Sequence, residues 1–258
     1  MFFLPPGTAN RGRRLTARFS AGSGSAGQLP NEPMSEILYV SEVLAGPRPR
    51  PRKISADEVL TDAMNVLIAL LALIFLAPVM LGVALAIFTQ DGGPMVFAHR
   101  RIGRDGRYFD CLKFRSMAAD AERRLTDLLA HDPVARAEWD KDHKLRNDPR
   151  VTKLGAFLRK SSLDELPQLF NVLRGEMSLV GPRPIVDAEI AKYGRRFKSY
   201  CAVKPGITGL WQVSGRNDVS YRARVAMDCI YARRRNVVMD GLIIAATVPA
   251  VLMRRGSY

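Results

Sequence analysis

The stretch AMNVLIALLALIFLAPVMLGVALAIFTQ, from Ala63 to Gln90, decides how the rest of the chain is interpreted. It contains 28 residues without a formal charge and consists mainly of Leu, Ala, Ile and Val. As one straight helix it would be roughly 42 Å long, whereas the hydrocarbon core of a bilayer is roughly 30 Å thick. The stretch therefore predicts a membrane-associated helix rather than a helix buried in a soluble core.

Pro78 lies near the middle of this stretch. There a proline removes the hydrogen bond to the Ile74 carbonyl and bends the helix, and each half alone is about 20 Å long and too short to cross. Basic residues at 48–53 and 100–104 flank both ends, which favours placing both ends on the cytoplasmic face. Two topologies fit this pattern: a re-entrant helix hairpin broken at Pro78, and a tilted, kinked single span.

The composition of the whole chain limits the kinds of partner and site. Among 258 residues, 39 Lys and Arg against 25 Asp and Glu give a formal charge of +14, which favours acidic or nucleotide-bearing partners. Hydrophobic residues make up 47% and charged residues 25%, the ordinary balance of a folded protein. The three cysteines have no C-x-x-C spacing, so we expect neither a disulfide framework nor a zinc site.

Three segments follow from these patterns. Residues 1–56, rich in Pro, Gly, Ser and Arg, predict a disordered basic arm; residues 57–92 form the membrane helix; and residues 93–258 form a cytoplasmic, α-rich domain lying on the membrane surface. The apolar tail Val237–Met253 is marginal for a span, so we expect a surface or amphipathic helix, or a helix packed in the core. The fold class is thus mainly α with a small β-hairpin.

Within the third segment, shorter patterns predict individual elements. Apolar residues on either side of Gly103-Arg104-Asp105-Gly106 predict a hairpin, and leucines at helical spacing predict a helix over 118–129. The polar stretch 131–150 is interpreted as a mobile loop with short helical pieces. A helix over 151–160 follows, and another begins near Asp164.

Asp164 and Glu165 are the first candidates for chemistry. If either Asp164 or Ser162 caps the next helix, both carboxylates lie at its N-terminus, where the helix dipole would lower a carboxylate pKa. Pro167 fits better with the Asp164 cap, which places it at the third helical position. On residue type alone, a simple capping role is a better explanation than catalysis.

The neighbouring motifs contain more cations than are required to neutralise the two carboxylates. The cations are Lys113, Arg115, Arg159, Lys160 and Arg183. Arg side chains match phosphate oxygens in a planar fork, and Lys supplies a point charge. Arg183 stands between two prolines in Gly-Pro-Arg-Pro, so its backbone is held rigidly on both sides. These residues predict a site for phosphate groups.

Four motifs together resemble the signatures of the bacterial sugar transferase family, the monotopic polyprenyl-phosphate hexose-1-phosphate transferases that start exopolysaccharide and O-antigen synthesis. They are KFRSM (113–117), SLDELPQ (162–168), SLVGPRP (178–184) and KPGITGLWQVSGR (204–216). The resemblance covers roughly residues 57–258. It implies a re-entrant membrane helix broken at a proline, although members often have Ser before that proline where this chain has Ala77.

The resemblance also implies an activity and roles for residues. A hexose-1-phosphate would pass from a UDP-hexose to undecaprenyl phosphate at the cytoplasmic face of the bacterial inner membrane, with release of UMP. Asp164 would be the nucleophile and Glu165 a ligand of Mg²⁺. Lys113 and Arg159 would bind phosphate, and Arg183 would belong to the nucleotide-sugar site. Arg115, a neighbour of Lys113 in the KFRSM motif, is predicted to bind phosphate with them.

Two other classes of function remain open from the sequence. A membrane-anchored scaffold would use Asp164 and Glu165 only as a helix cap. A nucleic-acid-binding module would explain the net charge, but no helix-turn-helix, RRM-like or zinc pattern is present, so we expect no nucleic-acid partner. The sequence leaves open which hexose is transferred and whether the chain forms a homodimer.

Overall fold

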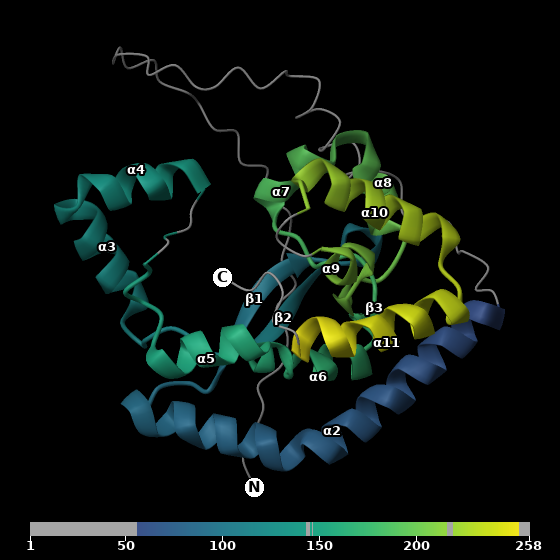
Figure 1. Cartoon of the computed structure of the whole chain (residues 1–258), viewed down its shortest axis with the longest axis horizontal. Coiled ribbons are helices and arrows are strands. Elements are labelled where there is room, and N and C mark those ends of the chain that lie inside the picture. The colour runs from purple at the N-terminus through teal and green to yellow at the C-terminus, as the bar shows by residue number, and fades with distance from the viewer. Residues whose placement is uncertain (1–55, 143–144, 146, 216–218, 253–258) are drawn as a thin grey trace, which may run out of the picture. The chain divides into compact units, whose positions relative to one another are not determined.

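A computed structural model of the chain describes residues 56–142, 145, 147–215 and 219–252, which all fall within one compact unit. This part is mainly helical and contains two small sheets (Figure 1). The helices are α2 (Ala56–Asp91), α3 (Ala121–His131), α4 (Pro133–Asp142), α5 (Lys153–Ser161), α6 (Gln168–Leu173), α7 (Asp187–Tyr193), α8 (Phe197–Cys201), α9 (Leu210–Ser214), α10 (Tyr221–Arg234) and α11 (Val237–Leu252). The strands are β1 (Val96–Ile102), β2 (Tyr108–Phe114), β3 (Ser178–Val180) and β4 (Gly206–Thr208).

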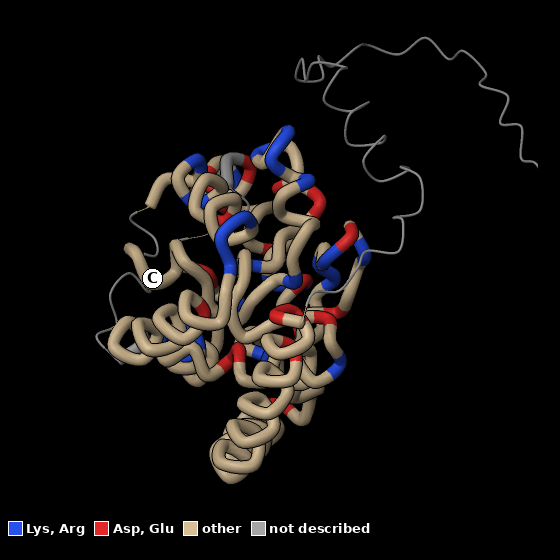
Figure 2. Tube along the Cα trace, turned by 90° about the vertical axis from the view of Figure 1, so that its right-hand side faces the viewer, with Lys and Arg blue, Asp and Glu red and all other residues tan. Residues whose placement is uncertain are grey.

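Helix α2 contains the long apolar stretch and is long and apolar enough to cross a membrane. It is continuous past Pro78 and bends near its middle (Figure 1). The lowest helical turns in Figure 2 belong to this bend and carry no charged residue. The membrane-length helix and its bend are therefore confirmed, whereas a helix hairpin is not established by the fold alone.

Polar side chains attach the first half of α2 to the rest of the fold. The Asn65 amide donates to Ser178 Oγ at 2.9 Å, and its carbonyl oxygen accepts from the Leu179 backbone N–H at 3.1 Å. Asp62 lies one helical turn before Asn65, and its Oδ2 is 2.9 Å from Lys204 Nζ. Because Asn65 is buried inside an otherwise apolar run, these bonds fix the rotation of α2 about its axis.

Strands β1 and β2 form the antiparallel hairpin expected around Gly103–Gly106, which is confirmed. The turn contains a short 3₁₀ segment, Arg104–Gly106, in which Asp105 has a left-handed φ of 58°. Phe109, Cys111 and Phe114 of β2 are buried in the core. Lys113 directly precedes Phe114 in the same strand, so the hairpin brings Lys113 to the edge of the core.

Strands β3 and β4 form a parallel pair that the sequence patterns did not predict. Ser178 pairs with Gly206 and Val180 with Thr208. A Cβ on Gly206 would lie only 2.0 Å from the Gly181 backbone nitrogen, so glycine is required for this close approach. The pair joins the SLVGPRP and KPGITG motifs side by side.

Several predicted boundaries need correction. The helix expected over 118–129 is α3, which begins at Ala121 and runs to His131. The stretch 131–150, expected to be a mobile loop with short helical pieces, contains the ten-residue helix α4. Helix α5 begins at Lys153, because the Thr152 side chain caps it by accepting from the Gly155 N–H. The predicted basic arm lies outside the described residues apart from Ala56.

The C-terminal helix α11 is both packed and exposed. Ile243 on one face belongs to the main core cluster, together with Ala69 of α2 and Val180 of β3. On the other face, Val238, Leu242 and Val248 are 72%, 67% and 58% exposed. Packing in the core is therefore seen on one face of the helix, and contact of the other face with a membrane surface stays a prediction.

Candidate active site

Asp164 and Glu165 lie in a short 3₁₀ turn, Leu163–Glu165, between α5 and α6. Helix α5 ends at Ser161, and Ser162 adopts a left-handed conformation with φ 58° that redirects the chain. Helix α6 begins only at Gln168, directly after Pro167. The prediction that Asp164 or Ser162 caps this helix is therefore wrong, since neither side chain makes a capping hydrogen bond there.

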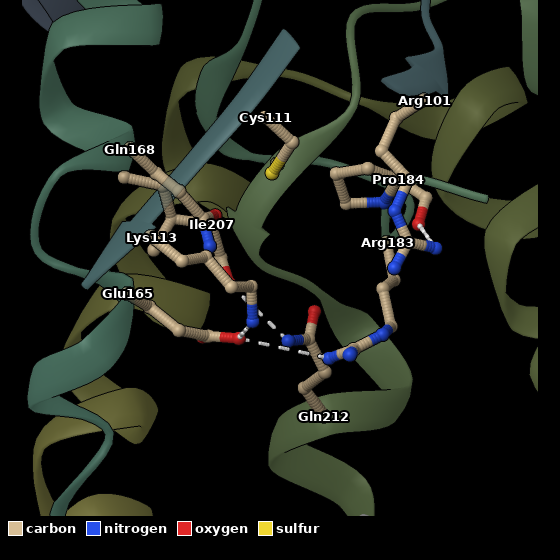
Figure 3. Close-up of a pocket in the computed structure, with 10 residues that line it drawn as sticks. Arg101, Cys111, Lys113, Glu165, Gln168, Arg183, Pro184, Ile207 and Gln212 are labelled. Atoms are coloured by element: carbon tan, nitrogen blue, oxygen red, sulfur yellow. Dashed lines mark hydrogen bonds and ion pairs between the residues drawn. The ribbon is translucent and has the colours of Figure 1, made fainter. Parts of the chain in front are cut away.

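Lys113, at the end of β2, faces both carboxylates. Its Nζ lies 2.7 Å from Glu165 Oε1 (Figure 3). The same Nζ lies 3.7 Å from Asp164 Oδ2. The lysine reaches this turn because β2 contacts it directly in the fold. One cation is thus shared between two carboxylates that are adjacent in the sequence.

Arg183 approaches the same pair from the opposite motif. Its Nη1 lies 3.8 Å from Glu165 Oε1, and its side chain is 46% exposed (Figure 3). The bond from the Gly206 N–H to the Pro182 carbonyl, 2.8 Å long, holds the backbone before it. Arg183 is therefore anchored on the protein side while its guanidinium remains accessible to a ligand.

Arg159 is positioned by the packing of α5 on the KFRSM motif. Its Nε donates to Ser116 Oγ at 2.8 Å. Gly155, one helical turn earlier, allows this contact, because a Cβ there would lie 1.9 Å from the Ser116 carbonyl oxygen. The motif that carries Lys113 thus also orients Arg159.

Arg115 has a different environment from the other cations. Its guanidinium forms an ion pair with Asp91, the last residue of α2, and its side chain is only 10% exposed. Asp91 also accepts from the Ala119 backbone N–H at 3.1 Å. Arg115 therefore ties the end of the membrane helix to the site, and its predicted contact with phosphate remains a prediction.

Burial raises the pKa of the Asp164 carboxyl above its ordinary value, opposed by the positive charges of Lys113, Arg159 and Arg183. The neighbouring Glu165 carboxylate raises it further. The sequence-based expectation of a pKa lowered by a helix terminus is wrong for this residue, because Asp164 lies in a buried turn. Its ionised form depends on the three cations instead.

One cavity of about 1410 Å³ has six of the predicted residues in its lining: Lys113, Arg115, Arg159, Asp164, Glu165 and Arg183. They come from three separate stretches of the sequence, 113–115, 159–165 and the loop that contains Arg183. Lys160, which was counted among the cations, is exposed on α5 and is not part of this lining. Figure 3 shows that Gln212 and Arg101 lie in the same region, and neither was predicted as a site residue. Gln212 stands within the quoted GLWQV motif, which was the available signal, whereas nothing distinguished Arg101 from other arginines.

The carboxylates can be tested against the requirements of Mg²⁺. Among the described residues, no group of three or more His, Cys, Asp or Glu side chains could hold a metal ion. Mg²⁺, however, is commonly held by one or two carboxylates, with waters and substrate phosphates completing its octahedron. Glu165, which lines the cavity beside three potential phosphate-binding cations, fits a site of this kind.

Comparison with known proteins identifies the family. The sequence profile described as bacterial sugar transferase matches residues 56–254. This chain belongs to the bacterial sugar transferase family. The match covers every described element and all four motifs quoted above.

Individual relatives of this bacterial sugar transferase are also similar. It is 52% identical over 223 residues to the UDP-galactose-lipid carrier transferase of Erwinia amylovora, covering 86% of this chain and 45% of that protein. It is 50% identical over 199 residues to the undecaprenyl-phosphate galactose phosphotransferase of Salmonella typhimurium, covering 77% of this chain and 42% of that protein. The exopolysaccharide production protein ExoY of Sinorhizobium fredii is 50% identical over 196 residues, 76% of this chain and 87% of that protein. The chain thus spans less than half of the first two relatives.

Proposed function

We propose that this bacterial sugar transferase transfers a hexose-1-phosphate from a UDP-hexose to undecaprenyl phosphate and thereby initiates polysaccharide synthesis. The observation that carries the proposal is the position of Asp164, buried in the wall of a large cavity beside Lys113 and Glu165. The names of the Erwinia and Salmonella relatives supply the substrate class, a UDP-sugar donor and an undecaprenyl-phosphate acceptor.

In the first step, an Asp164 carboxylate oxygen attacks the sugar-bearing phosphorus of the donor. An oxygen–phosphorus bond forms, the bond from that phosphorus to the bridging oxygen breaks, and UMP leaves with the electron pair. No proton has to move, provided that Asp164 is ionised. Lys113 and Arg159 favour the ionised carboxylate and balance negative charge on the phosphoryl oxygens.

In the second step, an oxygen of the acceptor phosphate attacks the same phosphorus. The bond to Asp164 breaks, the carboxylate is regenerated, and undecaprenyl-diphospho-hexose is released. Dividing the transfer this way keeps the two anionic substrates from having to face each other in one complex. The exposed guanidinium of Arg183 is accessible to either substrate's phosphate.

Glu165 is the residue that would hold Mg²⁺. When bound, the ion would neutralise charge on the diphosphate of the donor. The Glu165 carboxylate already lies close to two cations, Lys113 and Arg183, so it also aligns these side chains toward the cavity. Glu165→Gln is therefore expected to weaken both metal dependence and donor binding.

The packing of α2 supports a monotopic attachment at the cytoplasmic face of the inner membrane. Asn65 in its first half contacts β3, and Ile87 in its second half packs with Phe114 and Leu158 of the catalytic part. Both ends of α2 therefore contact the same part of the protein, which supports a topology with both ends on one side of a bilayer. The bend between them is its most exposed portion, with Phe75 82% and Leu81 71% exposed, which favours insertion into one leaflet.

The activity is tested with isolated membranes, undecaprenyl phosphate and a panel of radiolabelled UDP-hexoses, with and without Mg²⁺. We expect transfer of label to lipid from one donor, and complete loss of transfer in Asp164→Asn. Asp127→Asn, an exposed carboxylate on α3, is the matched control and should retain activity. Full transfer by Asp164→Asn would exclude Asp164 as the nucleophile, and absence of transfer with every donor would support a non-catalytic scaffold.

A further inference from the structure

The cavity around Asp164 extends well beyond the charged residues. Its volume of about 1410 Å³ exceeds the roughly 300–1,000 Å³ typical of small-molecule sites. On one side its lining is formed by α2 and α11, through Ala72, Leu76, Thr247 and Ala250. We call these four residues the α2–α11 wall.

The α2–α11 wall has no side-chain hydrogen-bond donor that is available to a ligand. Three of its residues are aliphatic, and the Thr247 hydroxyl donates to the Ile243 carbonyl at 2.7 Å. A hydroxyl has one proton, so Thr208 is the donor in the 2.8 Å contact between the two threonine hydroxyls. Both threonine donors are therefore engaged within the protein, and this side of the cavity is suited to an apolar ligand.

The same two helices carry the apolar outer surface of the molecule. Leu71 on α2 and Val248 on α11, each close in sequence to a wall residue, are 57% and 58% exposed. The two helices join one core cluster, which includes Ala69 and Ile243, and lie along the same side of the fold (Figure 1). The cavity therefore borders the surface that we place in the bilayer.

We propose that the α2–α11 wall binds the phosphate-proximal isoprenoid units of the acceptor lipid. The chain would then reach the cavity from the bilayer while its phosphate meets Lys113, Arg159 and Arg183 near Asp164. The small side chains of Ala72 and Ala250 leave room for a branched hydrocarbon chain between the helices. This inference rests on the proposed function and adds the route by which the lipid reaches the nucleophile.

The uridine and hexose of the donor fit this wall poorly. Both carry many hydrogen-bonding groups, and burying them without partners is unfavourable. Polar side chains are found instead in another part of the cavity lining, where Gln212 and Arg101 lie near Arg183. The wall is therefore expected to affect the second step of the reaction and to leave the first step unchanged.

The test uses Ala72→Phe and Ala250→Phe, which narrow the cavity from two different helices. Leu71→Phe and Val248→Phe enlarge exposed neighbours on the same helices and are the matched controls. Each full-length protein, in membranes or detergent, is assayed for UMP release and covalent labelling from the UDP-hexose without acceptor, and for transfer to undecaprenyl phosphate. We expect both wall variants to keep the first step and to lose transfer at least tenfold through a higher KM for the acceptor, while both controls resemble the parent.

A second measurement reads lipid contact without turnover. A polyprenyl phosphate with a photoreactive group near its phosphate should label peptides from α2 and α11, and the label should fall in Ala72→Phe and Ala250→Phe but not in the controls. Unchanged acceptor KM in both wall variants, or an equal loss of both steps, would overturn the inference. Failure of the proposed function is distinguishable, since the parent would then release no UMP and transfer no label.

Discussion

The Tyr231 hydroxyl lies 2.8 Å from Asp240 Oδ1 and 3.0 Å from the Val180 carbonyl oxygen. A tyrosine hydroxyl has only one proton to donate, so it cannot satisfy both oxygens if Asp240 is ionised. Burial raises the pKa of Asp240, and the hydrogen bond from Tyr231 and the positive charge of Arg235 oppose this rise. When Asp240 is neutral, its carboxyl can donate to Tyr231, and the Tyr231 proton then goes to Val180, which directly precedes the Gly-Pro-Arg-Pro loop of Arg183.

This relationship predicts different outcomes for two substitutions. Asp240→Asn should be close to the parent, because an amide N–H can replace the carboxyl proton. Tyr231→Phe should lower the free energy of unfolding by ~1–2 kcal/mol and raise the KM for the donor several-fold more than it lowers kcat. Thermal unfolding in detergent and donor saturation curves check both. If Asp240→Asn lowered the free energy of unfolding as much as Tyr231→Phe, Asp240 would have to be ionised in the parent.

A second prediction concerns Lys113. Its positive charge lowers the pKa of Asp164, so Lys113→Met should raise that pKa and leave less of the carboxylate ionised at a given pH. The acidic limb of the rate of UMP release should therefore move to higher pH, and the maximum rate should fall ~10²-fold. Lys160→Met, an exposed lysine on α5, is the control. An unchanged pH profile in Lys113→Met would show that this lysine does not govern the ionisation of Asp164.

A third prediction separates packing from chemistry at α5. Gly155→Ala would push a methyl group against the Ser116 carbonyl and displace Arg159, so we expect a loss of ~1–3 kcal/mol in unfolding free energy together with reduced transfer. Gly82→Ala on α2 meets nothing within 4 Å and should be neutral or slightly stabilising. Melting temperatures and transfer rates of the two variants are compared in the same detergent. Equal behaviour would mean that α5 shifts freely on the KFRSM motif.

Much of the site could be predicted from sequence because its chemistry is concentrated in contiguous motifs. The roles that the family resemblance implies for Asp164, Lys113 and Arg183 require all three to act on one phosphate-bearing ligand. In the structure Lys113 lies close to Asp164, and Arg183 lies close to the neighbouring Glu165. Helix α2 was equally predictable, since its length and lack of charge are local properties. The turn of the β1–β2 hairpin was marked by two glycines.

The remaining features depend on contacts between distant residues. The left-handed conformation of Ser162 moves the start of α6 from Asp164 to Gln168, and serine gives no local signal for it. Strands β3 and β4 have three residues each, too short for a periodic pattern, and pair only because the chain folds back between them. In the sequence, Asn65 only interrupts an apolar run. In the structure, its hydrogen bond to Ser178 of β3 explains why a polar residue stands there.

The last prediction concerns the pH dependence of stability and arises from the buried pair Tyr193–Asp228. The Tyr193 hydroxyl donates to Asp228 Oδ2 at 2.6 Å, and burial raises the pKa of Asp228 to about 7, opposed by Tyr193 and Arg224. Since the folded state binds this proton more tightly than the unfolded state, the group's contribution to stability is largest below pH 4 and is lost as the pH rises toward 7. Asp228→Asn should remove this contribution, on the order of a few kcal/mol, from the parent's stability profile between pH 4 and 7. The free energy of unfolding is measured in detergent across that pH range, and Asp127→Asn, at an exposed position, is the control. Identical pH profiles for the parent and Asp228→Asn would show that Asp228 is ionised in the folded protein throughout the range.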